Sequence, residues 1–272
     1  MNIKGKTIVI TGASSGIGAE AARTATSRGA RVILLARNQE RLQQIADTIS
    51  AACGTAAYYP IDLANAEAIT TCAREIIAKH GVPDVLINNA GAGKWRSILE
   101  TPADAVEQIM AVPYFAAFNL TREFLPGMIR QKQGHIVNVT SVASKLIWPG
   151  SAAYTATRWA VNGFNEALRS EVCDFGIHVT LAMFGKITSE YWQHNPGSEE
   201  RLPEITRMVP SITPAQAAHA IIRGIEKNQA FVLKPKMLRM VLWMNALFPG
   251  NTAYVMRKTG WQMPTSLNTA KQ

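Results

Sequence analysis

The chain has 272 residues, of which 47% are hydrophobic, and a formal net charge of +9. It can bury a large core and shows no internal repeat or low-complexity linker, so we expect one compact domain. Its cysteines, Cys53, Cys72 and Cys173, have no His or Cys partner at metal-ligand spacing, which excludes a disulfide framework and predicts no metal site.

Short apolar runs alternate with longer helical patterns along the chain. The runs are IVIT, VILLA, AAYYPI, DVLINN, HIVNVT and HVTLAM. The predicted helices cover residues 16–28, 39–52, 66–80, 113–131, 152–175 and 214–227. Such alternation is typical of parallel strands joined by right-handed crossovers. The predicted fold class is therefore α/β, a doubly wound parallel sheet of the Rossmann type in a single domain.

A glycine-rich turn follows the first strand, which begins at Thr7. The segment TGASSGIG at 11–18 would lead from strand to helix. Its glycines would let the backbone approach a pyrophosphate, which the amides and dipole of the helix N-terminus stabilise, while the serines add hydroxyl donors. A tight turn before a helix also needs glycine for purely structural reasons.

The end of the second strand carries a positive charge. Ala36 is followed by Arg37, where an acidic residue would accept the ribose hydroxyls of NAD. An anionic 2′-phosphate would meet a cation there, which favours NADP(H). Alternatively, Arg37 opens the next helix in solvent.

Ser141, Tyr154 and Arg158 form a candidate proton-transfer site. Tyr154 and Arg158 are spaced i and i+4, so on a helix they project from one face. Tyrosine ordinarily titrates near pH ~10, and a neighbouring cation favours its phenolate form. Ser141 would hold a carbonyl or alcohol by hydrogen bonding. Taken alone, a Tyr-x-x-x-Arg pair on a helix is more often a surface contact.

Together these segments resemble the short-chain dehydrogenase/reductase family from about residue 6 to about residue 229. That family is marked by TGxxxGxG, NNAG, and a serine followed by YxxxK. This chain has TGASSGIG at 11–18, NNAG at 88–91, Ser141, and YTATR at 154–158, with arginine in place of the catalytic lysine.

The resemblance implies a role for each matching position. Tyr154 would be the general acid in ketone reduction, Ser141 would orient the carbonyl, and a nicotinamide would deliver hydride. Asn88 would hold the central sheet instead of binding cofactor. The implied cofactor-binding residues are Gly12, Ser14, Ser15, Gly16, Ile17, Gly18, Arg37, Asp62, Leu63, Asn89, Ala90, Gly91, Tyr154, Arg158, Ile187 and Ser189. The expected activity interconverts a ketone and a secondary alcohol on a hydrophobic small molecule.

Two departures from the family pattern support an alternative function. Arg158 replaces the lysine, and the family's catalytic asparagine falls on Pro113. Arginine keeps a permanent charge and can bind a ribose diol, but it cannot relay a proton. An NADP-binding sensor or scaffold without catalysis is thus the alternative. Retention of Ser141 and Tyr154 favours the enzyme, because a scaffold needs neither.

Residues 190–212 occupy the position of the family's variable substrate lid. Tyr191, Trp192, Met208 and Val209 would either cover a hydrophobic substrate or pack on the body as core.

The chain divides into a catalytic domain, 1–229, and an apolar, basic C-terminal extension, 230–272. Residues 201–272 hold ten Lys or Arg against two acids. Residues 234–248 are apolar on nearly every helical face but too few to cross a bilayer. Three placements stay open: packing on the domain or a second subunit in a homo-oligomer, an anionic membrane surface touched through 234–261 with Trp243 and Trp261, or an acidic carrier protein.

The N-terminal residues MNIKGK lead straight into the first strand without an apolar signal core. We therefore expect a cytoplasmic protein, with membrane association as an alternative. Nucleic acid is not an expected partner, because the basic residues are not interleaved with a reading motif.

Overall fold

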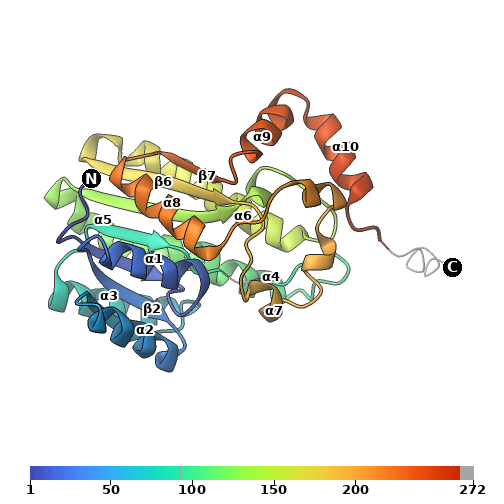
Figure 1. The fold of residues 1–272 in the computed structure, drawn as a ribbon. Coiled ribbons are helices and arrows are strands. Elements are labelled where there is room, and N and C mark those ends of the chain that lie inside the picture. Colours follow the sequence, from blue (N-terminus) through green and yellow to red (C-terminus); the bar gives the residue numbers. More distant parts are fainter. Residues whose placement is uncertain (92, 264–272) are drawn as a thin grey trace.

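The computed structural model describes residues 1–91 and 93–263 (Figure 1). These residues form a seven-stranded parallel sheet of order β3-β2-β1-β4-β5-β6-β7. The strands are β1 (Thr7–Thr11), β2 (Arg31–Ala36), β3 (Thr55–Pro60), β4 (Val85–Asn88), β5 (Gly134–Ser141), β6 (Ile177–Phe184) and β7 (Phe231–Lys234). The strand order reverses between β1 and β4, and that reversal is where open α/β sheets bind their ligands.

Helices cover both faces of the sheet, which is why its strands are almost continuously apolar. Apolar side chains of α1 (Gly16–Thr26), α2 (Gln39–Ala51) and α8 (Pro214–Glu226) pack in one core layer. Those of α3 (Ala66–His80), α5 (Ala116–Gln131) and α6 (Ala152–Glu171) pack in the layer on the opposite face. The doubly wound α/β fold is confirmed.

The seventh strand extends the sheet past the predicted domain boundary at residue 229. β7 runs parallel to β6, with Leu181 opposite Phe231 and Phe184 opposite Lys234. A boundary at 229 is therefore wrong for the sheet. β7 has four residues, too few for an alternating or continuous apolar pattern to stand out from its surroundings.

The helix predicted to begin at Pro113 begins earlier. The chain is already helical in α4 (Ala105–Met110), passes through a π-helical turn at Ala111–Phe115, and continues as α5. Proline has no backbone N–H to donate within a helix. The wider turn accommodates this local loss, so Pro113 is buried inside a helical segment instead of opening one.

A ladder of asparagine side chains joins the central strands to α6. Asn88 Nδ2 donates to Asn138 Oδ1 at 2.9 Å, and Asn138 Nδ2 donates to Asn165 Oδ1 at 3.1 Å. All three residues are buried. The prediction that Asn88 holds the central sheet is confirmed.

His135 on β5 gives the fold a specific pH dependence. Its Nε2 lies 2.7 Å from Thr180 Oγ1, whose hydroxyl donates to the Gln229 carbonyl, so His135 is the donor and stays neutral. Burial lowers the pKa of His135 from 6.5 to about 3, with the adjacent His178 as a lesser cause. The unfolded chain binds this proton below pH 6.5 and the folded chain does not.

We therefore expect His135 to cost stability as the pH falls from about 6.5 toward 3, by about 1 kcal/mol per pH unit. The variant His135→Gln keeps a donor for Thr180 but has no titration. Urea unfolding of both proteins at several pH values in this window checks the effect. The free energy of unfolding should fall less steeply in the variant; parallel curves would contradict the assignment.

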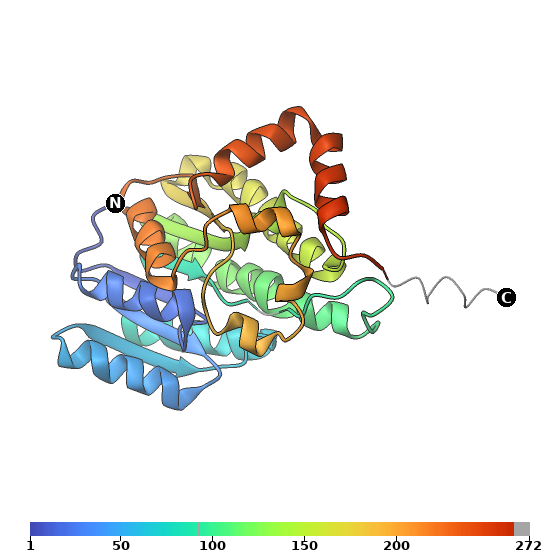
Figure 2. The ribbon, with the colours of Figure 1, turned by 45° about the vertical axis from the view of Figure 1, so that its right-hand side comes forward.

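The C-terminal extension forms a helical hairpin of α9 (Leu238–Leu247) and α10 (Pro249–Thr259). In Figures 1 and 2 the hairpin projects beyond the sheet, and α10 returns toward the carboxyl ends of the strands. Met256 of α10 is buried in an aromatic cluster there, and the Arg201 guanidinium lies over the Trp261 ring at 4.7 Å. Trp261 is therefore held on the domain rather than free for a membrane surface.

Across residues 1–91 and 93–263, the structure contains no helix with the length and apolar character that spanning a bilayer requires.

Candidate active site

Two elements, β5 and α6, bring the three predicted catalytic residues to one cavity of about 180 Å³. Ser141 ends β5, and Tyr154 and Arg158 lie one turn apart on α6. The same cavity is lined by five predicted cofactor-binding residues from other segments of the chain. They are Ile17, Asn89, Gly91, Ile187 and Ser189. The fold thus brings these distant segments to one cavity.

Arg158 is a buried cation without a carboxylate partner. Arg158 is only 7% exposed, and no ion pair joins its guanidinium to any described residue. Its Nε is buried without a hydrogen-bond partner. The guanidinium carbon lies 4.8 Å from the centre of the Tyr154 ring. A cation held this way is suited to bind hydroxyl groups of a ligand and to favour negative charge nearby.

Gly91 gives the Arg158 guanidinium its space. A Cβ at Gly91 would lie 3.0 Å from Arg158 Nη2. A larger residue at position 91 would therefore press on the guanidinium. This contact ties the NNAG segment to α6.

Ser141 keeps its hydroxyl hydrogen free for a ligand. Its Oγ accepts a hydrogen bond from the Ala143 amide at 3.3 Å, and among the described residues no acceptor receives its proton. That amide contact fixes the side chain at the start of a short 3-10 turn, Val142–Ser144.

Aromatic rings surround Tyr154. The centre of the Trp95 ring lies 4.9 Å from that of Tyr154, 5.3 Å from Trp148 and 5.7 Å from Trp192. Trp192, predicted either to cover a substrate or to pack as core, lines the cavity and packs against the cluster that contains Tyr154. Trp95 and Trp148 were not predicted, because no spacing rule connects them to the catalytic residues.

A second phenol in the cavity, that of Tyr191, already forms hydrogen bonds within the protein. Tyr191 Oη donates to the Gly93 carbonyl at 2.8 Å and accepts from Trp95 Nε1 at 3.1 Å. Burial raises the pKa of Tyr191, and the nearby Tyr154 raises it further. Tyr154 Oη, in contrast, has no hydrogen-bond partner among the described residues. Of the two phenols, only Tyr154 has a hydroxyl free to exchange a proton with a ligand.

The glycine turn fits a dinucleotide. Gly16 has φ +52° and open space where a Cβ would stand, and it lines a cavity of about 850 Å³ with Ser14 and Ser15. Gly12 and Gly18 serve close packing: a Cβ at Gly12 would lie 2.9 Å from Ala90 Cα, and one at Gly18 would lie 2.3 Å from the Gly12 carbonyl oxygen. The backbone is thus exposed at Gly16, as a pyrophosphate would require.

Thr11 locks this turn to the NNAG segment. Its Oγ1 accepts from the amides of Asn89 and Ala90, both at 2.9 Å, and Asn89 Nδ2 donates to the Thr11 carbonyl at 2.9 Å. Asn89 and Ala90 therefore lie beside the glycine turn, and their contact with a cofactor stays a prediction.

Two ion pairs hold the lid segment over the larger cavity. Arg41 of α2 pairs with Glu190 at 2.8 Å, and Lys186 pairs with Glu199 at 2.5 Å. Neither Arg41 nor Lys186 was predicted to have a role, since a single cation on a helix or in a loop is usually only solvated. Met208, offered as part of a cover, is 72% exposed, and Val209 packs beside a different core cluster; neither lines the catalytic cavity.

Three predicted cofactor residues lie apart from both cavities. Arg37 and Asp62 are exposed just after β2 and β3, and the Leu63 side chain is buried in a core layer. None of the three lines the cavity around Tyr154 or the one beside the glycine turn. Their roles stay predictions.

The fold and this arrangement define a nucleotide-binding α/β oxidoreductase. The family model described as short chain dehydrogenase matches residues 6–199, and the chain belongs to the short-chain dehydrogenase/reductase family. This membership was predicted from the motifs, and it supports a nicotinamide cofactor and a small-molecule substrate.

Relatives and solved structures agree with the assignment. The chain is 34% identical to Dehydrogenase/reductase SDR family member 7B of Bos taurus, over 91% of this chain and 79% of that protein. It is 33% identical to a Fatty acyl-CoA reductase of Acinetobacter baylyi, over 84% and 75% of the two chains. A metagenomic short-chain oxidoreductase in complex with NADP superposes with TM-score 0.70 at 32% identity, covering 86% of this chain and 96% of the other.

Proposed function

We propose that this protein is an NADP-dependent oxidoreductase that interconverts a ketone and a secondary alcohol on a hydrophobic small molecule. The observation that carries the proposal is the buried, carboxylate-free guanidinium of Arg158 against the Tyr154 ring, 4.8 Å from its centre. Burying an unpaired cation is unfavourable in free energy, so we expect a bound group to interact with it. The ribose hydroxyls of a dinucleotide and the phenolate of Tyr154 would both do so.

Each catalytic residue of the cavity has a distinct role in ketone reduction. The nicotinamide, when bound, supplies hydride to the carbonyl carbon. Tyr154 donates its hydroxyl proton to the carbonyl oxygen, and Ser141 donates a hydrogen bond to that oxygen. Because negative charge grows on the oxygen as the bond forms, both hydroxyls stabilise the transition state more than the ground state. Arg158 stabilises the Tyr154 phenolate that remains, and alcohol oxidation uses the same groups in reverse.

Positive charge near the adenosine end supports NADP(H) over NAD. Arg37 follows β2 directly, and Arg41 lies one helical turn further on, lining the cavity of the glycine turn. No carboxylate stands at position 36 or 37 to accept ribose hydroxyls. The NADP-bound oxidoreductase that resembles this chain at 32% identity adds support.

Arg37→Asp should reverse the cofactor preference. The carboxylate would repel the 2′-phosphate and accept the ribose hydroxyls of NAD, so NADPH should bind about 100-fold more weakly while NADH binding is kept or improved. Titration of each cofactor by nicotinamide fluorescence measures both constants. Arg31→Asp, at the opposite end of β2, is the matched control. An unchanged NADPH affinity in Arg37→Asp would contradict the assignment.

The aromatic lining supports an apolar substrate. Trp95, Trp148 and Trp192 border the catalytic cavity, which also holds the three proposed catalytic side chains. The relative named a fatty acyl-CoA reductase supports a substrate with a long apolar chain.

Exposed aromatic residues on α5 and α6 support a homo-oligomer. Phe118 and Trp159 are exposed, and the Phe118 ring lies 5.6 Å from that of Phe164. An apolar patch of this kind typically meets another subunit. Sedimentation velocity of the full chain measures the subunit number, and a monomer at every concentration would refute this part of the proposal.

A cofactor-binding sensor or scaffold is the second candidate, favoured by Arg158 and Pro113. NADPH titration followed by a panel of apolar ketones separates the two functions. Oxidation of NADPH with any ketone, dependent on enzyme concentration, supports the enzyme. Tight NADPH binding without turnover on any ketone would support the scaffold.

A further inference from the structure

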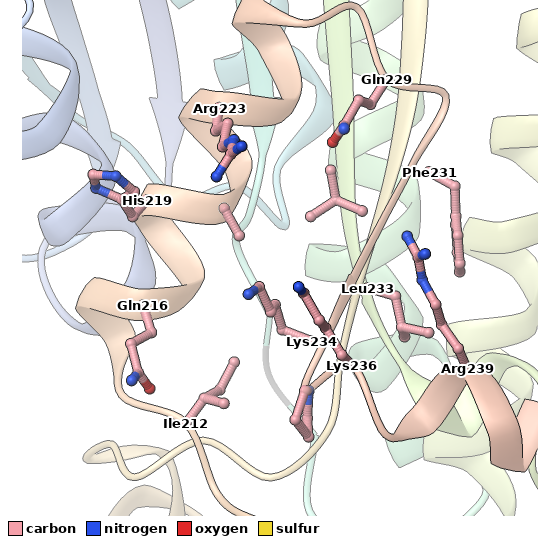
Figure 3. A pocket seen from close by; sticks show the side chains of 13 residues that line it. Ile212, Gln216, His219, Arg223, Gln229, Phe231, Leu233, Lys234, Lys236 and Arg239 are labelled. Atoms are coloured by element: carbon pink, nitrogen blue, oxygen red, sulfur yellow. The ribbon is translucent and has the colours of Figure 1, made fainter.

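A groove lined by cations lies between α8, β7 and the start of α9. Its volume is about 600 Å³, and its charged side chains are Arg223, Lys234, Lys236 and Arg239. In Figure 3 the lysine side chains extend into the space below Arg223, and the Gln229 amide turns toward the same space. Among the described residues, no acidic side chain lines the groove and no ion pair involves any of its four cations. Like charges gathered without a counter-charge indicate an anionic ligand.

The outer face of α9 is apolar and uncovered. Met240 is 58% exposed, Trp243 64% and Leu247 52%. These residues recur at intervals of three and four, so they form one stripe along the helix. The opposite face packs inward, where Leu238 is buried and Leu242 contacts the core.

The groove and the apolar stripe form one continuous surface. Arg239 and Trp243 are spaced i and i+4 on α9, so this cation of the groove lies one turn before an exposed apolar side chain. Lys236 lies two residues before the helix begins at Leu238. The surface therefore passes from the positive charge of the groove to the exposed hydrocarbon of α9. We call it the α9 face: the four groove cations with Met240, Trp243 and Leu247.

We propose that the α9 face docks this protein on an anionic lipid bilayer. Headgroup phosphates would occupy the groove, and the three apolar side chains would enter the boundary of the acyl region, with tryptophan at the depth that it prefers. The docking is peripheral, since the apolar stripe lies along one side of a short helix. It does not depend on the proposed catalytic activity.

Charge argues for lipid and against a second copy of the chain. Residues 227–263 contain six basic residues, Lys227, Lys234, Lys236, Arg239, Arg257 and Lys258, and no acidic one. A twofold contact of the α9 face with itself would set cations against cations. A bilayer bearing anionic phosphates meets both the charge and the apolar stripe.

The geometry of the hairpin gives docking a consequence for substrate access. While α9 presents its outer face, Met256 of α10 is buried in the cluster that contains Trp95 and Tyr154. Val241 and Leu242 of α9 pack against the same cluster, so the helical hairpin that would rest on the bilayer also borders the catalytic residues. An apolar substrate could pass between membrane and cavity over a short path.

Flotation of the full chain with vesicles tests the proposal. Vesicles of phosphatidylcholine with phosphatidylglycerol should carry the protein upward, vesicles of phosphatidylcholine alone should not, and high salt should release it. Lys236→Gln with Arg239→Gln should weaken binding about 30-fold, from the loss of two charges near the surface. Trp243→Gln with Leu247→Gln should weaken it at least about tenfold.

Matched variants keep the result interpretable. Arg122→Gln with Arg130→Gln removes the same charge from exposed positions on α5 and should float like the natural protein. Thermal melting and NADPH binding verify that every variant is folded. Equal binding to neutral and anionic vesicles would overturn the proposal, as would an α5 variant that binds as weakly as the groove variant. Failure of the folded chain to float, with Trp243→Gln and Leu247→Gln lowering its oligomeric state, would assign the α9 face to a second copy instead.

Discussion

Tyr154→Phe should lower turnover by about a hundred- to ten-thousand-fold while leaving NADPH affinity within about twofold. The size of the loss is that of a general acid removed from its transition state. Phenylalanine fills the same space between Trp95 and the Arg158 guanidinium, so the ring contacts at 4.9 and 4.8 Å can persist. Only the hydroxyl is lost. Steady-state rates with an apolar ketone, together with a fluorescence titration of NADPH, measure the two quantities separately.

Tyr191→Phe is the control that the cavity itself provides. Tyr191 lines the same space, but its hydroxyl donates to the Gly93 carbonyl and burial raises its pKa. Removing this hydroxyl should lower the melting temperature, because a buried carbonyl loses its donor, and should change turnover by less than about tenfold. Equal loss of turnover in both variants, or a normal rate in Tyr154→Phe, would contradict the assignment of Tyr154 as the proton donor.

Arg158→Met should stabilise the cofactor-free protein and abolish its function. Methionine reaches as far as the arginine Nε and removes a cation that is buried without a carboxylate. The relief of desolvation should exceed the lost cation–π contact and raise the free energy of unfolding by about 1 kcal/mol, or roughly 2–4 °C in melting temperature. Without the guanidinium, turnover should fall at least about a hundredfold, and NADPH should stabilise the variant less than the natural protein.

Arg201→Met is the matched substitution at a satisfied arginine. Arg201 Nη1 and Nη2 donate to the two oxygens of Glu100 at 2.7 and 2.8 Å, and this bond lowers the pKa of Glu100 to about 2. Breaking such a pair should lower the melting temperature, opposite in sign to Arg158→Met. Differential scanning fluorimetry with and without NADPH compares all three proteins. If Arg158→Met melted below the natural protein without cofactor, the guanidinium would be a structural contact instead of a ligand group.

The sequence by itself determined the fold class, the family and most of the catalytic cavity. Parallel strands put their carboxyl ends at one edge, so motifs that end different strands must converge there. The family motifs implied one site for Asn89, Ser141, Tyr154 and Ser189, and the structure brings all four to one cavity. Gly16 lines the cavity beside the glycine turn. The i, i+4 spacing likewise fixed Tyr154 and Arg158 to one helix face before any coordinates.

The tertiary structure alone decided the features that depend on contacts between distant segments. Trp95 reaches Tyr154 from a loop and Tyr191 from a four-residue helix, and no local periodicity encodes the path of either segment. The hydrogen bond between Trp95 and Tyr191 explains which phenol is free. The short strand β7 exists because β6 offers it an edge to pair with, which is why a boundary at residue 229 failed. Whether a cation such as Arg158 has a carboxylate partner depends on all the residues that folding brings next to it. The local sequence around Arg158 does not specify those residues.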